Sequence, residues 1–358
     1  MRQRGATLVL VIALLAAATA SGQPAAGVAE NWWNVPYPQA FDATKLPQTL
    51  SWLRVEGNRF VDERGRTVVL QGVNISDPDK LLQQGRWSKA HFEAVKSWGA
   101  RVVRVPVHPV AWKGRGPVEY FKLLDQAVTW ASELGLYLLL EWHGIGNLET
   151  EVFQHPMHET TKGETYQFWR GIAFRYGQVP ALAFYELFNE PTDYRGQLGR
   201  ITWQQWKAIN EEFIGIIRAH DARGIPLVGG FDWAYELRSV MAAPINAEGI
   251  GYVTHPYPMK AQQPWEANWE RDFGHVADRY PLFASEIGFM AASDPGAHVP
   301  VMADEDYGRR IVAYFAKKGI SWTVWSFDPD WPPQMISDWS YTPTRQGAFF
   351  RAVMLQQK

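Results

Sequence analysis

The chain has 358 residues, with 35 Lys and Arg against 37 Asp and Glu, and it contains no cysteine. Apolar residues make up 46% of the chain, which excludes an intrinsically disordered protein because that much apolar surface can offset the entropy lost on folding. The nearly balanced charge argues against a nucleic-acid-binding protein, which usually carries a basic excess. The missing cysteines exclude a disulfide framework, an iron–sulfur cluster, a thiolate zinc site and a cysteine nucleophile.

Residues 1–20 have the pattern of a secretory signal peptide. Arg2 and Arg4 precede an apolar run over residues 8–17, and the Ala-Thr-Ala sequence at 18–20 is typical of a signal-peptidase site. The apolar run is shorter than the roughly 20 residues that a membrane-spanning helix needs. We therefore expect cleavage and a mature protein that is secreted or periplasmic, with no membrane contact after cleavage.

Residues 21–48 are rich in Pro, Ala and Gly and include Trp32, Trp33 and Tyr37, which predicts an N-terminal arm on the surface of the domain. Residues 49–358 contain no linker rich in Ser, Thr or Pro and no low-complexity tract, so we expect one domain there. Roughly 310 residues is a usual size for a single α/β barrel.

Strand-like and helix-like segments alternate from residue 49 onward, after a short predicted hairpin at 55–65. Apolar runs predict strands at 68–73, 101–107, 136–142, 182–188, 226–231, 250–254, 281–286 and 321–327. Helical spacing of apolar residues predicts helices at 88–99, 120–135, 168–177, 203–224, 265–280, 307–318 and 344–355. Repeated strand–helix units with eight strands predict an α/β fold, a single-domain (β/α)8 TIM barrel. The alternative is an open doubly wound sheet, which is less favoured because no Gly-rich phosphate loop follows the first strand.

Polar residues follow most of the predicted strands, at the ends where a (β/α)8 barrel has its active site. Among them, Glu190 and Glu286 follow the fourth and seventh strands. Two opposed carboxylates suit the hydrolysis of a glycosidic bond, because one can protonate the leaving group while the other attacks the anomeric carbon. A lone Glu is usually a surface carboxylate, but Glu190 directly follows an apolar strand and precedes Pro191, unlike a residue on a solvated helix face.

The sequence Asn189-Glu190-Pro191 resembles the Asn-Glu-Pro motif of glycoside hydrolase family 5, the cellulase-like family of retaining β-glycanases. This motif also occurs in related barrel families, but further residues occur here in the order typical of the family. They are Arg104, His143, the Asn189–Glu190 pair, His255, Tyr257, Glu286 and Trp325. The resemblance covers roughly residues 50–356.

The resemblance implies the roles of the catalytic residues. Glu190 would be the acid/base, and Glu286 would be the nucleophile that forms a glycosyl-enzyme intermediate. Arg104 and Tyr257 would hydrogen-bond the nucleophile and keep it ionised, and His255 would orient Glu190.

The resemblance also implies contacts to the sugar. Asn189 would bind the sugar 2-hydroxyl, His143 would contact the sugar at the cleavage subsite, and Trp325 would form a platform beneath it. Trp233 is a further candidate for stacking on a neighbouring ring. Ile287 departs from the pattern, because many family members have an aromatic residue after the nucleophile, and this leaves the subfamily open.

Two other features have structural interpretations. His155 and His158 suggest a metal cluster, but Pro156 prevents a regular helix that would place both on one ligand face, and no third ligand follows in a recognisable pattern. We therefore expect no metal and no cofactor, and a loop here that forms a wall of the cleft. Glu141 is expected to be a buried structural carboxylate rather than a second acid.

These observations together predict a secreted retaining endo-β-glycanase that hydrolyses β-1,4-glucan as an endoglucanase, acts on polysaccharides or oligosaccharides and is a monomer. A β-mannanase, a xyloglucanase and a β-1,3-glucanase remain alternatives, because such specificity depends on loop contacts of about 1–3 kcal/mol each. A non-catalytic carbohydrate-binding barrel and a metal-dependent hydrolase are more remote alternatives. The presence of both Glu190 and Glu286 argues against the binding-only protein.

Overall fold

The computed structural model describes residues 31–356, so the predicted signal peptide lies outside the described residues. Eight parallel strands close into a barrel in the order β10-β11-β12-β13-β3-β4-β5-β8. They are β3 (Gln71–Asn74), β4 (Val102–Val107), β5 (Tyr137–Trp142), β8 (Leu182–Glu186), β10 (Ile225–Gly229), β11 (Gly251–Val253), β12 (Leu282–Ile287) and β13 (Ser321–Val324). The closed barrel confirms the predicted (β/α)8 fold and excludes the open sheet.

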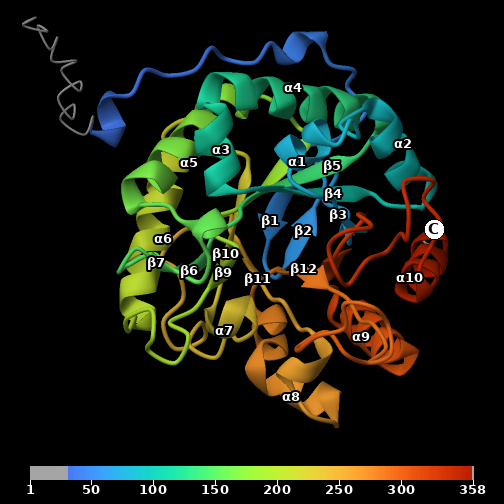
Figure 1. Ribbon diagram of the computed structural model, residues 1–358. Coiled ribbons are helices and arrows are strands. Elements are labelled where there is room, and N and C mark those ends of the chain that lie inside the picture. Colours follow the sequence, from blue (N-terminus) through green and yellow to red (C-terminus); the bar gives the residue numbers. More distant parts are fainter. Residues whose placement is uncertain (1–30, 357–358) are drawn as a thin grey trace, which may run out of the picture.

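Helices surround the strands (Figure 1). They are α1 (Pro78–Gln83), α2 (Lys89–Ser97), α3 (Pro109–Arg115), α4 (Pro117–Leu134), α5 (Lys162–Tyr176), α6 (Trp203–Arg218), α7 (Phe231–Ala234), α8 (Trp265–Asp272), α9 (Glu305–Lys318) and α10 (Arg345–Leu355). Capping boxes of Thr161 with Glu164, and of Thr202 with Gln205, begin α5 and α6. None of the helices among residues 31–356 has the length and apolar character that crossing a bilayer requires.

Two predicted helices end earlier than their apolar spacing indicated. α6 ends at Arg218, whose guanidinium donates to the carbonyl oxygens of Asp221 and Gly224 as the chain turns. α8 ends at Asp272, and a short 3-10 segment at Gly274–Asp278 replaces the rest of the predicted helix.

The interior of the barrel changes from apolar to charged along the strands. The apolar layer consists of Val102, Leu139, Phe184, Leu227, Val253 and Phe283, together with neighbours from the lead-in segment. Side chains two residues apart on a strand face the same side, so the residues that follow in β4, β5 and β8 also point inward. These are Arg104, Glu141 and Glu186, all fully buried.

A hairpin of β1 (Arg54–Glu56) and β2 (Arg59–Val61) covers the apolar end of the barrel. The ring of Phe60 contacts the rings of Phe184 and Phe283, with centroids 5.0 and 6.5 Å away. This hairpin was predicted from the sequence, and its contacts show that it packs against the lower layer of the barrel.

Residues 31–48, the described part of the N-terminal segment, begin against α5 and then continue along the outside of the helix layer (Figure 1, blue). The ring of Trp32 contacts that of Tyr166, and the guanidinium of Arg170 lies 3.6 Å from the ring centroid of Tyr37. Arg170 also donates to the carbonyl oxygen of Val35. The hydroxyl of Tyr37 also lies 3.3 Å from His220 Nε2, beyond the end of α6, so the segment is attached to more than one helix of the outer layer.

We expect Gly72→Ala to destabilise the barrel strongly. A Cβ atom at Gly72 would lie 1.8 Å from the carbonyl oxygen of Val102 on β4, and neither backbone can move without breaking the sheet. The free energy of unfolding, measured by urea denaturation, should fall by at least about 3 kcal/mol. Gly215→Ala is the control, because a Cβ atom there meets nothing within 4 Å on an exposed helix face. It should raise stability by about 0.5–1 kcal/mol, and equal effects of the two changes would contradict the packing argument.

Candidate active site

The backbone of Glu190 is held against the end of β5 rather than by the strand that precedes it. β8 ends at Glu186, four residues before Glu190, and not at Phe188 as predicted. Glu190 then pairs through β9 (Glu190–Pro191) with β6 (Ile145–Asn147), which also pairs with β7 (Val152–Phe153). The Glu190 amide donates to the carbonyl oxygen of Gly144 at 3.0 Å. This three-stranded sheet was not predicted, and it fixes where the half-buried carboxylate of Glu190 enters the cleft.

Glu286 lies on β12 at a local irregularity of the barrel. The register between β12 and β13 shifts between Ala284 and Ile287. Such a shift allows two consecutive side chains, Ser285 and Glu286, to contact groups inside the barrel. Glu286 is 5% exposed, and its two oxygens accept hydrogen bonds from Arg104 Nη1 and Tyr257 Oη, each at 2.8 Å.

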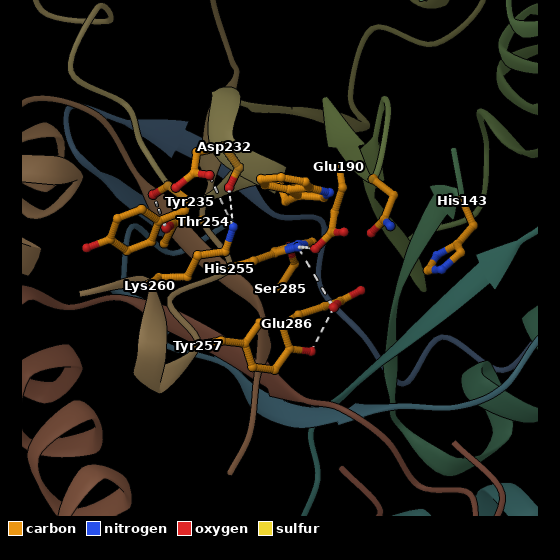
Figure 2. Close-up of polar contacts among 12 residues, drawn as sticks. His143, Glu190, Asp232, Tyr235, Thr254, His255, Tyr257, Lys260, Ser285 and Glu286 are labelled. Atoms are coloured by element: carbon orange, nitrogen blue, oxygen red, sulfur yellow. Dashed lines mark hydrogen bonds and ion pairs between the residues drawn. The ribbon is translucent and has the colours of Figure 1, made fainter. Parts of the chain in front are cut away.

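His255 lies between the two carboxylates (Figure 2). Its Nδ1 is 3.0 Å from Glu190 Oε1 and 3.8 Å from Glu286 Oε2. Its Nε2 is 3.0 Å from Ser285 Oγ, and Ser285 in turn donates to Glu186. Although burial alone would lower it, the carboxylates of Glu286, Glu186 and Glu190 raise the pKa of His255 to about 9. His255 is therefore a cation at neutral pH that donates from both ring nitrogens.

Glu190 and Glu286 face each other across a short gap. One carboxylate oxygen of Glu190, one of Glu286 and a ring nitrogen of His255 all lie within 4.8 Å of one another. Burial raises the pKa of Glu286, while the neighbouring His255 and Arg104 oppose that rise. The site therefore holds two close carboxylates that differ in partners and in exposure.

Arg104 is the centre of a buried ionic cluster beneath the cleft. Its guanidinium binds Glu186 through two hydrogen bonds, of 2.8 and 2.7 Å, and Glu286 through a third. The remaining donors reach Asn74 Oδ1 at 2.9 Å and Asn189 Oδ1 at 2.7 Å. Although burial alone would raise it, Arg104 and His255 lower the pKa of Glu186.

Sequence reasoning assigned no role to Glu186 or Asn74. The signal for Glu186 was its position two residues after Phe184, because the alternation of a strand places both side chains inside the barrel. Glu141 is a buried structural carboxylate, 3.6 Å from Arg104 and 2.9 Å from His143 Nδ1, and burial raises its pKa well above the usual range.

A cleft of about 670 Å³ lies above these groups. Its lining includes His143, Asn189, Glu190, Trp233, Tyr257, Glu286 and Trp325. Of the nine residues singled out in the sequence, these seven meet in one cleft, whereas Arg104 and His255 lie directly beneath and support the carboxylates.

Stacked aromatic rings form one side of the cleft. Trp325 follows β13 and stacks against Trp331, with centroids 5.8 Å apart and an angle of 8° between the planes. Its ring is also nearly parallel to His143, at 5.6 Å and 13°. Asp328, three residues after Trp325, is buried and accepts hydrogen bonds from Ser76 and Lys80.

Trp233 lies on the opposite side of Glu190, on α7 rather than at the end of a strand. Asp232, Trp233 and Ala234 all have positive φ values, from 55° to 56°. Trp233 Nε1 donates to Gln154 Oε1 at 2.8 Å, and Lys260 Nζ lies 4.3 Å from the ring centroid. A strained backbone held by such contacts is typical of a functional position, which agrees with Trp233 as a sugar contact.

We expect Arg104→Leu to destabilise the protein in a pH-dependent manner. Without the guanidinium, Glu186 and Glu286 would be buried carboxylates that lack their cation, at a cost of about 3–5 kcal/mol near pH 7. In the wild type the lowered pKa of Glu186 contributes stability above its unfolded pKa, and this contribution is absent from the variant. The loss should therefore be larger at pH 7 than at pH 4, in urea denaturation at both values. Arg310→Leu, at an exposed ion pair, should change stability little at either pH.

Comparison with known proteins identifies the family. A model of the family described as Cellulase (glycosyl hydrolase family 5) matches residues 61–330. Endoglucanase A of Butyrivibrio fibrisolvens is 28% identical over 284 residues, which cover 76% of this chain and 59% of that protein. Endoglucanase N of Pectobacterium atrosepticum is 25% identical over 292 residues, which cover 80% of this chain and 59% of that protein. The matched part of the chain thus spans about three fifths of these relatives.

Solved structures agree with this assignment. The β-glucanase SdGluc5_26A of Saccharophagus degradans is 49% identical, with a TM-score of 0.88 over 91% of this chain and 99% of that chain. Another structure of that β-glucanase is a complex with cellotetraose. The catalytic domain of an endoglucanase from Thermobifida fusca, 21% identical with a TM-score of 0.68 over 85% of this chain and 97% of that chain, has the same fold. Since the family match covers most of the chain and includes both carboxylates of the cleft, the chain belongs to the cellulase family, glycosyl hydrolase family 5.

Proposed function

We propose that this protein is an exported endo-β-glucanase that hydrolyses β-1,4-linked glucan with retention of configuration. The observation that carries the proposal is the close approach of Glu190 and Glu286, which have carboxylate oxygens within 4.8 Å of each other. Retaining glycosidases hold their two carboxyl groups about 5–5.5 Å apart, whereas inverting enzymes leave about 6.5–9.5 Å for a water molecule. The short gap supports direct attack by one carboxylate.

The hydrogen-bond partners of Glu190 and Glu286 support different catalytic roles for the two carboxylates. Glu286 accepts hydrogen bonds at both oxygens, from Arg104 and Tyr257, which aim the ionised carboxylate at the anomeric carbon. Glu190 accepts from His255 at Oε1, which leaves Oε2 to give a proton to the leaving-group oxygen. We therefore assign Glu286 as nucleophile and Glu190 as acid/base.

The second half of the reaction reverses the role of Glu190. In the first step Glu190 gives its proton to the leaving-group oxygen while Glu286 forms an ester with the sugar. The ionised Glu190 then takes a proton from the water that attacks this ester, and Glu286 is released as a carboxylate. Glu190 thus ends the cycle protonated, as it began.

Three residues supply contacts for the sugar. Asn189 Oδ1 accepts from Arg104, so the amide nitrogen of Asn189 is the group available to a sugar hydroxyl in the cleft. Trp325 offers a ring face backed by Trp331, and Trp233 offers a second aromatic surface beyond Glu190. Platforms on both sides of the scissile position support endo-acting cleavage of a chain.

β-1,4-Glucan is favoured as substrate by the related proteins. The 49% identical β-glucanase has been crystallised with cellotetraose, and several curated relatives are endoglucanases. Export is proposed from the signal-peptide pattern of residues 1–20 alone.

The first experiment is reducing-sugar release by residues 21–358 from carboxymethylcellulose, mixed-linkage glucan, glucomannan, xyloglucan, laminarin and xylan. We expect activity on the first two, and a loss of at least about 10³-fold in Glu286→Ala because the covalent step is lost. Glu93→Ala, at an exposed site on α2, is the matched control and should be fully active. Proton NMR of the first products should show the β-anomer, and an initial α-anomer would contradict retention.

We also expect the acidic limb of the pH profile to depend on His255. Only ionised Glu286 can attack, so kcat/KM should fall as the pH drops through the pKa of Glu286, which burial has raised. The His255 cation opposes that rise, so His255→Gln should move the acidic limb to higher pH. The measurement is kcat/KM against pH on an uncharged soluble glucan. His275→Gln, remote from the cleft, should leave the limb in place, and a shift to lower pH in His255→Gln would refute the assigned charge.

A further inference from the structure

Three buried histidines meet beside the cleft, although they are far apart in the sequence. His108 follows β4, His143 follows β5, and His158 ends the 3-10 segment Pro156–His158. One ring nitrogen of each lies within 4.8 Å of one ring nitrogen of each of the others. His155 takes no part in this cluster and is exposed. The sequence analysis paired His155 with His158 and therefore missed the set.

Each of the three rings is oriented by an acceptor at Nδ1. His143 Nδ1 lies 2.9 Å from Glu141 Oε2, and His158 Nδ1 lies 2.8 Å from the carbonyl oxygen of His143. His108 Nδ1 lies 3.2 Å from Asp77 Oδ2. The carbonyl oxygen of His143 can only accept, so Nδ1 of His158 carries the proton and its Nε2 has the free lone pair. His108 and His143 present a lone pair at Nε2 in the same way when Nδ1 donates to Asp77 and Glu141. No hydrogen-bond partner of the three Nε2 atoms occurs among residues 31–356.

Asp77, which holds His108, is itself tightly fixed. Its Oδ1 accepts from the hydroxyl of Tyr120 at 2.8 Å and from the amide of Asp79 at 2.7 Å. Its Oδ2 also accepts from the backbone amide of His108 at 2.8 Å. The orientation of the His108 ring is therefore set before any ligand binds.

All three histidines are buried, with exposed fractions of 2% for His108, 5% for His143 and 6% for His158. Neutral imidazoles with Nδ1 bound to a carboxylate or carbonyl are the usual form of histidine as a metal ligand. The cationic His255, between Glu190 and Glu286, offers no such lone pair.

We propose that His108, His143 and His158 bind one divalent transition-metal ion of the Zn²⁺ class through their three Nε2 atoms, with a further coordination position open to the cleft. Three imidazoles favour Zn²⁺, Cu²⁺, Ni²⁺ or Co²⁺ over Mg²⁺ and Ca²⁺, which prefer oxygen ligands. One ring nitrogen of each histidine lies within 4.8 Å of the others, so an ion at their centre would be at most about 2.8 Å from each, and ring rotations would bring the Nε2 atoms to the usual 2.0–2.1 Å.

The site has a consequence for the proposed hydrolysis. His143 lines the cleft and stacks near Trp325, so it cannot bind an ion and contact a sugar through the same Nε2. Metal binding and glycan binding should therefore compete, and the ion should inhibit the enzyme rather than assist it. This second part rests on the proposed function, whereas metal binding itself does not.

The test is direct titration of tag-free, chelator-treated protein. Zn²⁺ in isothermal calorimetry should bind with one ion per chain, and Co²⁺ should give visible absorption bands of a low-coordinate site. His108→Ala and His158→Ala should each weaken binding by at least about 10-fold, with thermal unfolding in the absence of metal as the check on folding. His155→Ala, on the same loop but outside the cluster, is the matched control and should bind as the wild type does.

The outcomes separate the two parts of the proposal. Absence of saturable binding, or equal affinity in the wild type, His108→Ala and His158→Ala, would refute the metal site. If one ion binds, added Zn²⁺ should raise KM for glucan, and EDTA should restore it. Unchanged KM at saturating Zn²⁺ would refute competition while leaving the site intact. If no glycan is hydrolysed, the proposed function fails, but calorimetry still decides the metal site.

Discussion

The guanidinium of Arg104, buried inside the barrel, is the constraint on which the rest of the site depends. It binds Glu186 through two parallel hydrogen bonds and also contacts Glu286, Asn74 and Asn189. A planar group with five donors is suited to hold several acceptors at fixed angles. In a low-dielectric interior a complete set of such hydrogen bonds stabilises the fold. Removal of one member leaves a buried charge without its partner and strongly destabilises the protein. Glu286, the proposed nucleophile, and the amide of Asn189 are therefore oriented by the same side chain, which couples the position of one to that of the other.

Much of this architecture could be predicted from the sequence, because strands and helices leave characteristic patterns of apolar residues within single segments. These patterns predicted the eight strands, the helices and the polar residues at strand ends. Glu190, Glu286 and Tyr257 meet in one cleft, as expected. What escaped prediction depends on contacts between segments. Two examples are the register shift beside Glu286 and the pairing of Glu190 with β6. Both depend on neighbouring strands, so the sequence of a single segment does not predict them.

The two sides of the cleft are built in different ways. On one side Trp325, Trp331 and His143 stack, so each ring is backed by another and the surface is rigid. On the other side Trp233 depends on strained backbone and on contacts with Gln154 and Lys260. Contacts of this kind between separate loops have no periodic signal in the sequence, so the position of Trp233 could not be predicted in detail. Such an asymmetry suits a site that fixes one sugar firmly and tolerates variation in the next.

The apolar layer beneath the charged cluster has a further consequence for the chemistry. Phe184 and Phe283, covered by Phe60 of the lead-in hairpin, separate the carboxylates from solvent at the opposite end of the barrel. The ionic cluster of Arg104, Glu186, Glu286 and His255 therefore has an apolar floor and faces water only on the side of the cleft. A glycan bound there would displace water from that remaining side. The ion pairs of the cluster would then act in a less polar medium, in which charge–charge interactions are stronger.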